Sequence, residues 1–319
     1  MNEQKDELNI KCFDHNVHII TYYPIITDFL INKLEFKKEN CNYFEYQFLF
    51  EPIKNLNLKK EIQNLDSYKL AAGKYYYNMS LNKYYIIYKS GDISIWDFSN
   101  KEFKTYINQI TNIRSMFFLH ILDPLSIAIM EYNKLVLHGA LLKKKNKEEG
   151  LLILGKSGYG KSTISNILSK KYNYYVYSDD VLYVKDTELG IAEGIDVGLG
   201  FLKNNSCQIN DEYSYEIETE RKKYFFRKHK LSDSIKITNI IILADKNYKG
   251  FVIEQISKEA FLKKVLNLQT NIPSKFLKNK LNCLEKLYDK CNTYSVKYDQ
   301  ICNVEKLCAY LERVNNEIY

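Results

Sequence analysis

The stretch "LLILGKSGYGKSTISNIL", residues 151–168, places an apolar run, a glycine-rich loop and a helical pattern in immediate succession. The loop matches the phosphate-loop (Walker A) pattern G-x-x-x-x-G-K-[ST], with a strand expected before it and a helix after it. The glycines let the backbone turn inward with positive φ, so that N–H groups at the positive end of the helix can hold phosphate oxygens. The stretch therefore predicts a nucleotide site formed by Gly155, Lys156, Ser157, Gly158, Tyr159, Gly160, Lys161, Ser162 and Thr163.

Two side chains of this loop have distinct chemical tasks. The Lys161 ammonium can bring a positive charge to the β- and γ-phosphates, and the Ser162 hydroxyl can ligate Mg²⁺. The cofactors expected from the loop are therefore ATP and Mg²⁺.

Adjacent carboxylates, Asp179 and Asp180, follow in "YYVYSDDVLYV", soon after Lys161. We expect them at the carboxyl end of a strand next to the loop strand, the edge at which open α/β sheets bind ligands. Two neighbouring acids can divide labour, one contacting the metal and the other taking a proton from an attacking hydroxyl. The alternative is a pair of acids in a surface turn.

The pattern outside this stretch predicts an α/β protein of two domains. Short β-like runs separated by turns predict a β-rich or α+β domain over residues 1–112, with a hairpin at "KSGD", 89–92. The second domain, 113–319, carries the phosphate loop and ends in a largely helical part. Expected there are a helix at 115–132, strands at 134–142, 151–155, 174–184 and 236–245, irregular β structure at 188–200, and a polar loop at 217–230.

Composition excludes several other classes of protein. The net charge of +7 is a mild basic excess that fits a solvated lysine-rich surface better than a nucleic-acid platform. The seven cysteines form no C-x-x-C pair, so reduced structural thiols are expected. The chain starts without an apolar signal segment, and the apolar stretch 115–130 contains Asp123 and Pro124, which indicates a core helix. We therefore expect a cytoplasmic protein that is not membrane-bound.

In combination, "LVLHGALL", "LLILGKSGYGKSTISNIL" and "YVYSDDVLYV" resemble the catalytic domain of HPr kinase/phosphorylase and of its shorter relatives, over about residues 115–250. Those relatives include enzymes found with ribosomally made peptides such as lasso peptides. The resemblance implies a core shared with ATP-dependent phosphoenolpyruvate carboxykinase. It also implies ATP-dependent phosphorylation of a serine hydroxyl on a peptide or protein. No "LEIRG"-like signature follows the acidic pair, so the reverse phosphorylase reaction and HPr itself are not implied.

The same resemblance implies a role for individual residues. Asp180 is the expected catalytic base or acid, and Asp179 supports it and the metal together with Ser162. Lys161 is expected to serve the transferring phosphate, and His138 to orient or tune the carboxylates. On its residue type alone, His138 is equally compatible with a core histidine at a strand end.

Three further residues are weaker candidates. Glu193 could ligate the metal, although a solvated loop acid is the alternative reading. Arg221 and Arg227 lie in a basic run that could reach the transferring phosphate or hold an acidic substrate, or could simply be solvated.

The function predicted from these residues is that of a serine kinase acting on a peptide or carrier protein, with the first domain a candidate docking or regulatory module. Two alternatives stay open: a nucleotide-binding regulatory module that transfers nothing, and a small-molecule phosphate-loop kinase. The paired acids favour the enzyme, because a nucleotide sensor needs only one metal-positioning carboxylate. The acceptor and the oligomeric state, with a homo-oligomer as one option, are left open.

Overall fold

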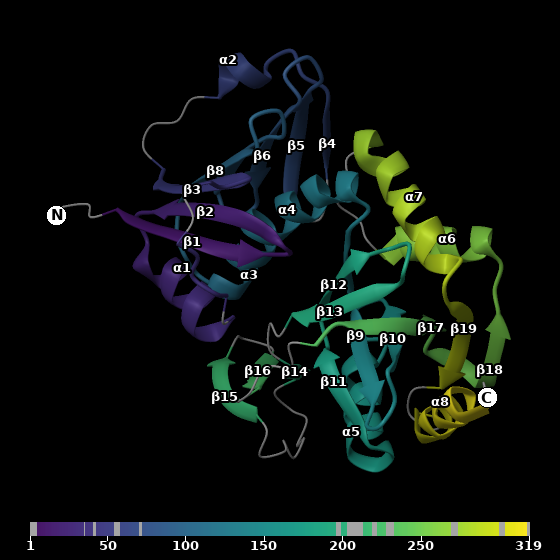
Figure 1. The fold of residues 1–319 in the computed structure, drawn as a ribbon. Coiled ribbons are helices and arrows are strands. Elements are labelled where there is room, and N and C mark those ends of the chain that lie inside the picture. Colours follow the sequence, from purple (N-terminus) through teal and green to yellow (C-terminus); the bar gives the residue numbers. More distant parts are fainter. Residues whose placement is uncertain are drawn as a thin grey trace. The chain divides into compact units, whose positions relative to one another are not determined.

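The computed structural model describes residues 5–34, 36–40, 43–53, 58–69, 72–195, 199–202, 213–218, 222–227, 233–268, 274–299 and 304–317. The chain divides into two compact units, Met1–Ile129 and Met130–Tyr319. Each unit contains one large mixed sheet, and the protein is therefore of the mixed α/β class (Figure 1).

The first unit is built on an eight-stranded sheet with the order β1-β2-β3-β8-β7-β6-β5-β4. The predicted hairpin is confirmed: β6 and β7 pair antiparallel, and Gly91 in the turn has φ +88°. The strands are β1 (Asp6–Cys12), β2 (His15–Thr21), β3 (Tyr46–Pro52), β4 (Ser67–Lys69), β5 (Gly73–Asn78), β6 (Lys83–Tyr88), β7 (Ile93–Asp97) and β8 (Glu102–Ile107).

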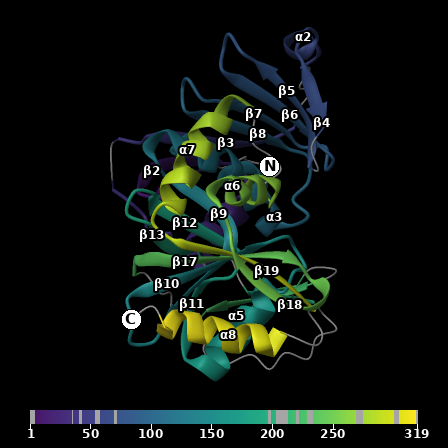
Figure 2. The same ribbon diagram turned by 90° about the vertical axis from the view of Figure 1, so that its right-hand side faces the viewer.

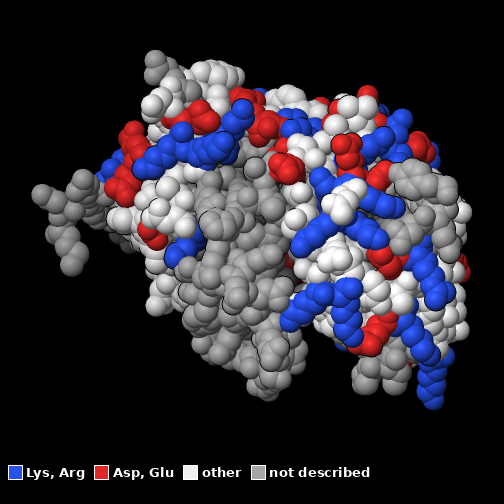
Figure 3. Space-filling view, turned by 60° about the horizontal axis from the view of Figure 1, so that its bottom comes forward, with Lys and Arg blue, Asp and Glu red and all other residues white. Residues whose placement is uncertain are grey.

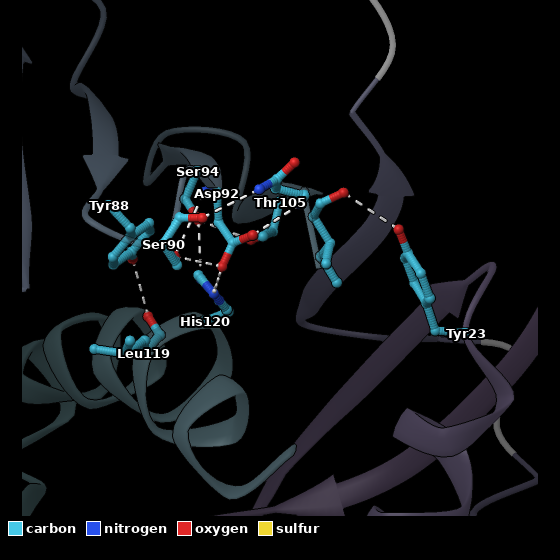
Figure 4. A network of polar contacts seen from close by, with 10 residues as sticks. Tyr23, Tyr88, Ser90, Asp92, Ser94, Thr105, Leu119 and His120 are labelled. Atoms are coloured by element: carbon cyan, nitrogen blue, oxygen red, sulfur yellow. Dashed lines mark hydrogen bonds and ion pairs between the residues drawn. The ribbon is translucent and has the colours of Figure 1, made fainter. Parts of the chain in front are cut away.

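One face of this sheet supports helices, namely α1 (Pro24–Asp28), η1 (Phe29–Lys33) and the run α3 (Ile113–Phe117), η2 (Phe118–Leu122) and α4 (Asp123–Ala128). A further short helix is α2 (Lys59–Ile62). The Asn112 side chain caps α3 by accepting from the Ser115 amide at 3.1 Å. The Tyr88 hydroxyl of β6 donates to the Leu119 carbonyl at 3.1 Å (Figure 4). These contacts place the run in the first unit, whereas the sequence assigned residues from 113 onward to the second domain.

The helical run continues through η3 (Ile129–Tyr132). By length and composition alone Ile113–Tyr132 could cross a membrane, but 61% of its most apolar window is buried inside the protein. Phe117, Ile121 and Leu125 are among its fully buried side chains. The burial agrees with the core helix expected from the sequence.

The sheet of the second unit is built around a long antiparallel strand, β9. One edge of β9 pairs with β10, and the other edge pairs first with β12 and then with β11. On its far side β10 pairs parallel with β17, which in turn pairs parallel with β19. The strands are β9 (Leu135–Lys144), β10 (Glu149–Gly155), β11 (Tyr174–Ser178), β12 (Val181–Asp186), β13 (Ile191–Ile195), β17 (Ile235–Asp245), β18 (Asn247–Gln255) and β19 (Asn292–Asp299).

Helices cover both faces of this sheet, with α5 and α8 on one side and α6 and α7 on the other (Figure 2). An apolar cluster joins α5 and α8 to the strands β9, β10, β17 and β19. Each fully buried aliphatic side chain in such a cluster contributes about 1.5–3 kcal/mol. The helices are α5 (Lys161–Tyr172), α6 (Lys258–Leu268), η4 (Ser274–Phe276), α7 (Leu277–Tyr288) and α8 (Val304–Glu317).

The acidic pair breaks the strand that was expected to run through it. β11 ends at Ser178 and β12 begins at Val181, so Asp179 and Asp180 form a two-residue bend, here called the acidic turn, between two strands that both run antiparallel to β9. The Ser178 hydroxyl accepts from the Val181 amide at 3.1 Å, a local hydrogen bond that competes with the strand ladder. Successive strand residues also face opposite sides, so an unbroken strand would direct one acid into the apolar layer.

The expectation that this strand lies next to the loop strand is wrong. β11 pairs with β9, and β9 lies between it and β10. The reason is that β10 already has both edges occupied, one by its hairpin partner β9 and the other by β17. Because β10 and β11 are both antiparallel to β9, they still run in the same direction, and their carboxyl ends meet at one edge of the sheet.

Between β13 and β17 the chain forms a separate three-stranded sheet of β14 (Leu199–Leu202), β16 (Lys222–Arg227) and β15 (Tyr213–Glu218), in that order. The polar loop expected at 217–230 is therefore replaced in part by strand β16. On the face that Figure 3 shows, basic and acidic side chains of the described residues are interspersed. Some of the lysines form ion pairs with neighbouring acids, such as Lys171 with Glu305 at 2.5 Å.

Candidate active site

The phosphate loop connects the end of β10 to the first turn of α5. Gly158 and Gly160 have φ of +78° and +85°, values that favour glycine, as the sequence predicted for these two positions. The positive φ expected from the sequence for Gly155 is wrong: Gly155 ends β10 without one, and glycine fits there because a Cβ would lie 3.0 Å from the Cβ of Leu243 on β17. The loop is thus fixed by backbone conformation at its crest and by close strand packing at its base.

The Lys161 side chain is buried against the loop. Its Nζ donates to the Gly155 carbonyl at 2.8 Å and lies 3.4 Å from the Lys156 carbonyl. Lys161 is also the first residue of α5, and Ser162 stands next to it in the first turn. The ammonium group is therefore held at the N-terminus of a helix, where backbone N–H groups and the helix dipole favour an anion.

The turn that carries the acids is held by Ser178. Its buried hydroxyl donates to the carbonyl of Ile195 on β13, at 3.2 Å, and accepts from the Val181 amide. The Asp180 carbonyl accepts from the Gly139 amide of β9 at 3.1 Å. Hydrogen bonds from two neighbouring strands thus fix the backbone on both sides of the acidic pair.

Asp180 and His138 form a direct side-chain contact in the site. His138 Nδ1 lies 2.8 Å from Asp180 Oδ1, and the two side chains are 40% and 23% exposed. The contact follows from strand pairing, because His138 on β9 lies opposite Val181 on β12. Asp179 differs from its neighbour, since its Oδ1 is shielded from solvent. A histidine in this position can orient Asp180, while exposure leaves the carboxylate accessible to a reacting group.

Two glycines allow the strands around the pair to approach closely. A Cβ at Gly139 would lie 2.8 Å from the Ile153 carbonyl oxygen on β10. A Cβ at Gly194 on β13 would lie 2.0 Å from the Tyr177 carbonyl oxygen, directly before the acidic turn. Gly139 therefore explains the His-Gly sequence of "LHGALL". Gly194 was not identified from the sequence, although it stands in the glycine-punctuated stretch "IAEGIDVGLG".

The central strand β9 brings the two halves of the site to the same level of the sheet. Gly139 pairs with Leu154, the residue before Gly155, and its amide binds Asp180. His138, the adjacent residue, reaches the Asp180 side chain. The base of the phosphate loop, the histidine and the acidic turn thus meet at the carboxyl ends of β10 and β11.

The weaker candidates have other partners or fall where the structure describes no side chain. Glu193 pairs with Lys185 at 2.8 Å and accepts from the Ser234 hydroxyl at 2.7 Å. The backbone of Arg227 lies in β16, and Arg221 falls outside the described residues.

Within the part of the chain that the structure describes, no three His, Cys, Asp or Glu residues gather as a metal cage. Ser162 and Asp179, the magnesium ligands expected from the sequence, carry oxygen atoms of the kind that Mg²⁺ binds.

Sequence reasoning also missed two side chains that donate to backbone carbonyl groups of the loop, Lys246 and Tyr298. Lys246 directly follows β17, the parallel neighbour of the loop strand. The general rule that ligands bind at the carboxyl ends of such strands could have indicated it.

Comparison with known proteins adds no assignment to this geometry. No family model matches the chain, and no curated protein matches its sequence. The resemblance to HPr kinase/phosphorylase therefore rests on the motif residues alone.

Proposed function

We propose that the protein is an ATP- and Mg²⁺-dependent kinase that transfers the γ-phosphate to a serine hydroxyl of a peptide or protein. It would have a phosphate-loop core of the HPr kinase and phosphoenolpyruvate carboxykinase type. The observation that carries the proposal is the meeting of the loop base with the His138–Asp180 pair across β9. A nucleotide-binding module has no need of an accessible carboxylate with an orienting histidine.

In this proposal the residues of the chain divide into two groups. The loop amides, the α5 N-terminus and Lys161 bind the phosphates, and Ser162 and Asp179 are the residues that would hold Mg²⁺. The metal would neutralise charge on the phosphate oxygens. Asp180 accepts the proton of the serine hydroxyl as the serine oxygen attacks the γ-phosphorus and the bond from that phosphorus to the leaving ADP oxygen breaks. His138 keeps the receiving carboxylate oriented by its 2.8 Å contact.

The acceptor is proposed to dock on the first unit and to be a peptide of the ribosomally made kind. Strand addition at a free sheet edge would serve this purpose. The outer edge of β1 is already bridged in part, by Ile10 with Lys38. The other edge strand, β4, has only three residues. Side-chain recognition on the sheet would therefore have to contribute more to docking than main-chain pairing.

Nucleotide binding and phosphate transfer are tested separately. Titration calorimetry with Mg-ATP should show binding to the wild-type protein, and radiolabelled ATP should label an array of serine-containing peptides. Lys161→Ala should reduce labelling about 10²-fold or more, because it removes a charge that stabilises the transition state. Labelling by Lys161→Ala at the wild-type rate would contradict the loop assignment, and an absence of Mg-ATP binding by the wild type would contradict the proposal as a whole.

A further inference from the structure

Two side chains from later in the chain, one in a strand and one in a turn, donate to carbonyl groups of the phosphate loop. The Tyr298 hydroxyl of β19 donates to the Tyr159 carbonyl at 2.5 Å. Lys246 Nζ, in the turn after β17, donates to the Gly158 carbonyl at 3.1 Å. Two consecutive carbonyl groups at the crest of the loop are therefore each held by a side chain from outside it.

Holding these carbonyls also fixes the N–H groups of the same peptide planes. In a trans peptide the C=O and N–H bonds point in opposite directions. With the Tyr159 carbonyl held by Tyr298, the Gly160 amide of the same peptide plane points away from Tyr298. The Tyr159 amide, in the plane of the Gly158 carbonyl, bonds back to the Lys156 carbonyl at 3.2 Å.

Both donors are themselves held in place by their surroundings. Tyr298 is fully buried in the cluster between α5, α8 and the sheet, and burial raises the pKa of its phenol well above the ordinary value, so it stays a donor. Lys246 stands in a turn closed by the Asn247 amide, which donates to Asp245 Oδ1 at 2.9 Å. The Lys246 ammonium also lies 5.7 Å from the centre of the Tyr159 ring.

We propose that Tyr298 and Lys246 are positioning residues for a nucleoside triphosphate, and that they hold the Gly158–Gly160 segment in its phosphate-binding conformation. This inference rests on the proposed nucleotide site and assigns it two residues that lie outside the loop motif. A loop with three glycines has many backbone conformations open to it, and ordering them on binding would weaken affinity. Braces that order the loop in advance reduce that cost for the polyphosphate part of any ligand.

The test compares variants that remove one donor with matched controls. Tyr298→Phe removes only the hydroxyl, and Lys246→Met removes the ammonium while keeping a long side chain. Lys246→Arg keeps a donor. Tyr294→Phe, on the same strand, is the control for Tyr298, because the Tyr294 hydroxyl makes no hydrogen bond to the described residues. Lys249→Met, at an exposed position, is the control for Lys246.

The measured quantities are the Kd for Mg-ATP, the Kd for inorganic tripolyphosphate and the melting temperature without ligand. Loss of one hydrogen bond to the loop should weaken both ligands by the same factor, about 3- to 10-fold for Tyr298→Phe and for Lys246→Met. Lys246→Arg should restore most of the affinity, and both controls should bind within about 2-fold of the wild type.

A purely structural role would lower the melting temperature of Tyr298→Phe and leave both dissociation constants unchanged, which would overturn the inference. Equal weakening by Tyr294→Phe would also overturn it. If the wild-type protein binds neither ligand, the proposed function fails and the inference fails with it. If the wild type binds and the two donor variants bind equally well, only the inference fails.

Discussion

The chain contains two His–Asp pairs in its described residues, one in each unit, and they differ in what surrounds them. In the first unit His120 Nε2 lies 3.6 Å from Asp92 Oδ2, with side chains only 1% and 10% exposed. In the second unit His138 and Asp180 are closer, at 2.8 Å, and far more exposed. The same two residue types therefore occur once inside a core and once at the ends of strands beside a phosphate loop.

The buried pair belongs to a polar network that joins the helical run to the sheet (Figure 4). Ser94 Oγ lies 3.2 Å from His120 Nδ1 and 2.8 Å from Thr105 Oγ1. Asp92 accepts from the Ser90 hydroxyl and from the Asn108 amide. A serine, a histidine and an aspartate in contact match the residue types of a hydrolase triad. Ser94 has no exposed surface, so no substrate can reach its hydroxyl. Exposure to solvent therefore distinguishes the candidate catalytic pair, His138–Asp180, from the structural pair, His120–Asp92.

The largest expected effect concerns the exposed pair. Asp180→Asn keeps the size of the side chain but removes the proton acceptor. We expect phosphate transfer to fall about 10²-fold or more, the usual scale for the loss of a general base, with the Kd for Mg-ATP within about 2-fold of the wild type. Single-turnover transfer and calorimetry on the same preparation measure the two quantities. Unchanged transfer would move the base role to Asp179.

For the buried pair we expect a loss of stability, whereas for the exposed pair we expect a loss of phosphate transfer. His120→Ala removes one buried partner from Asp92 and one from Ser94, and should lower the free energy of unfolding by about 2–4 kcal/mol. His138→Ala removes an exposed side chain and should lower it by less than about 1 kcal/mol, while it slows phosphate transfer about 10-fold. The chain has a single tryptophan, Trp96, which is buried in the first unit, so urea unfolding followed by its fluorescence reports on that unit.

Since His138 lies in the second unit, circular dichroism must accompany the fluorescence measurement for that variant. The comparison would be wrong if His138→Ala unfolded the protein as readily as His120→Ala does. It would also be wrong if His120→Ala left stability unchanged.

The sequence predicted the elements around the phosphate loop because their signals are local. An apolar run, glycines at defined offsets and a helical period are enough to predict β10, the loop and α5. The positive φ of Gly158 and Gly160 also follows from the motif. The prediction was wrong about which strands pair with one another. The place of β9 between β10 and β11 depends on which edges are already occupied, and that information is not local.

The same reason limits what could be known of the site. Asp180 and His138 were selected by residue type and family resemblance, but their contact depends on the register that sets His138 opposite Val181. Ser178 and Gly194 hold the acidic turn through contacts with other strands, and no short motif marks them. The buried network around His120 escaped notice entirely, because its members come from β7, β8 and η2 and carry no spacing signature.

A third prediction uses pH to sharpen the account of the buried pair. Burial raises the pKa of Asp92, but hydrogen bonds from His120, the Asn108 amide and Ser90 outweigh it, so the pKa lies below its usual value of 3.8. A depressed pKa stabilises the folded state above the unfolded-state pKa, and this stabilisation is lost as the pH falls through the folded-state pKa. The wild type should therefore lose its advantage in unfolding free energy over Asp92→Asn as the pH falls from 5 to below 3.8.

Urea unfolding followed by Trp96 fluorescence at pH 6, 5, 4 and 3 measures this difference for both proteins. Asp97→Asn is a positive control, because the pKa of Asp97 is also lowered, with the partly exposed Lys83 as its partner instead of a histidine. The same loss of wild-type advantage at low pH is expected for it. A difference between wild type and Asp92→Asn that stays constant from pH 6 to pH 3 would show that ionisation of Asp92 contributes nothing to stability.

The smallest effect is expected for an acid that has its own cation. Glu193 pairs with Lys185, and both side chains are 33% exposed, so the ion pair should contribute less than about 1 kcal/mol to stability. Because Oε1 of Glu193 already accepts from Lys185 and Ser234, Glu193→Gln should change phosphate transfer by less than about 3-fold and leave its Mg²⁺ dependence unchanged. Lys185→Met is the matched control, since it removes the cation and frees the carboxylate. A Mg²⁺ requirement that rises several-fold in Glu193→Gln but not in Lys185→Met would instead assign Glu193 to the metal, and the acids of the site would then extend along β13 beyond the Asp179–Asp180 turn.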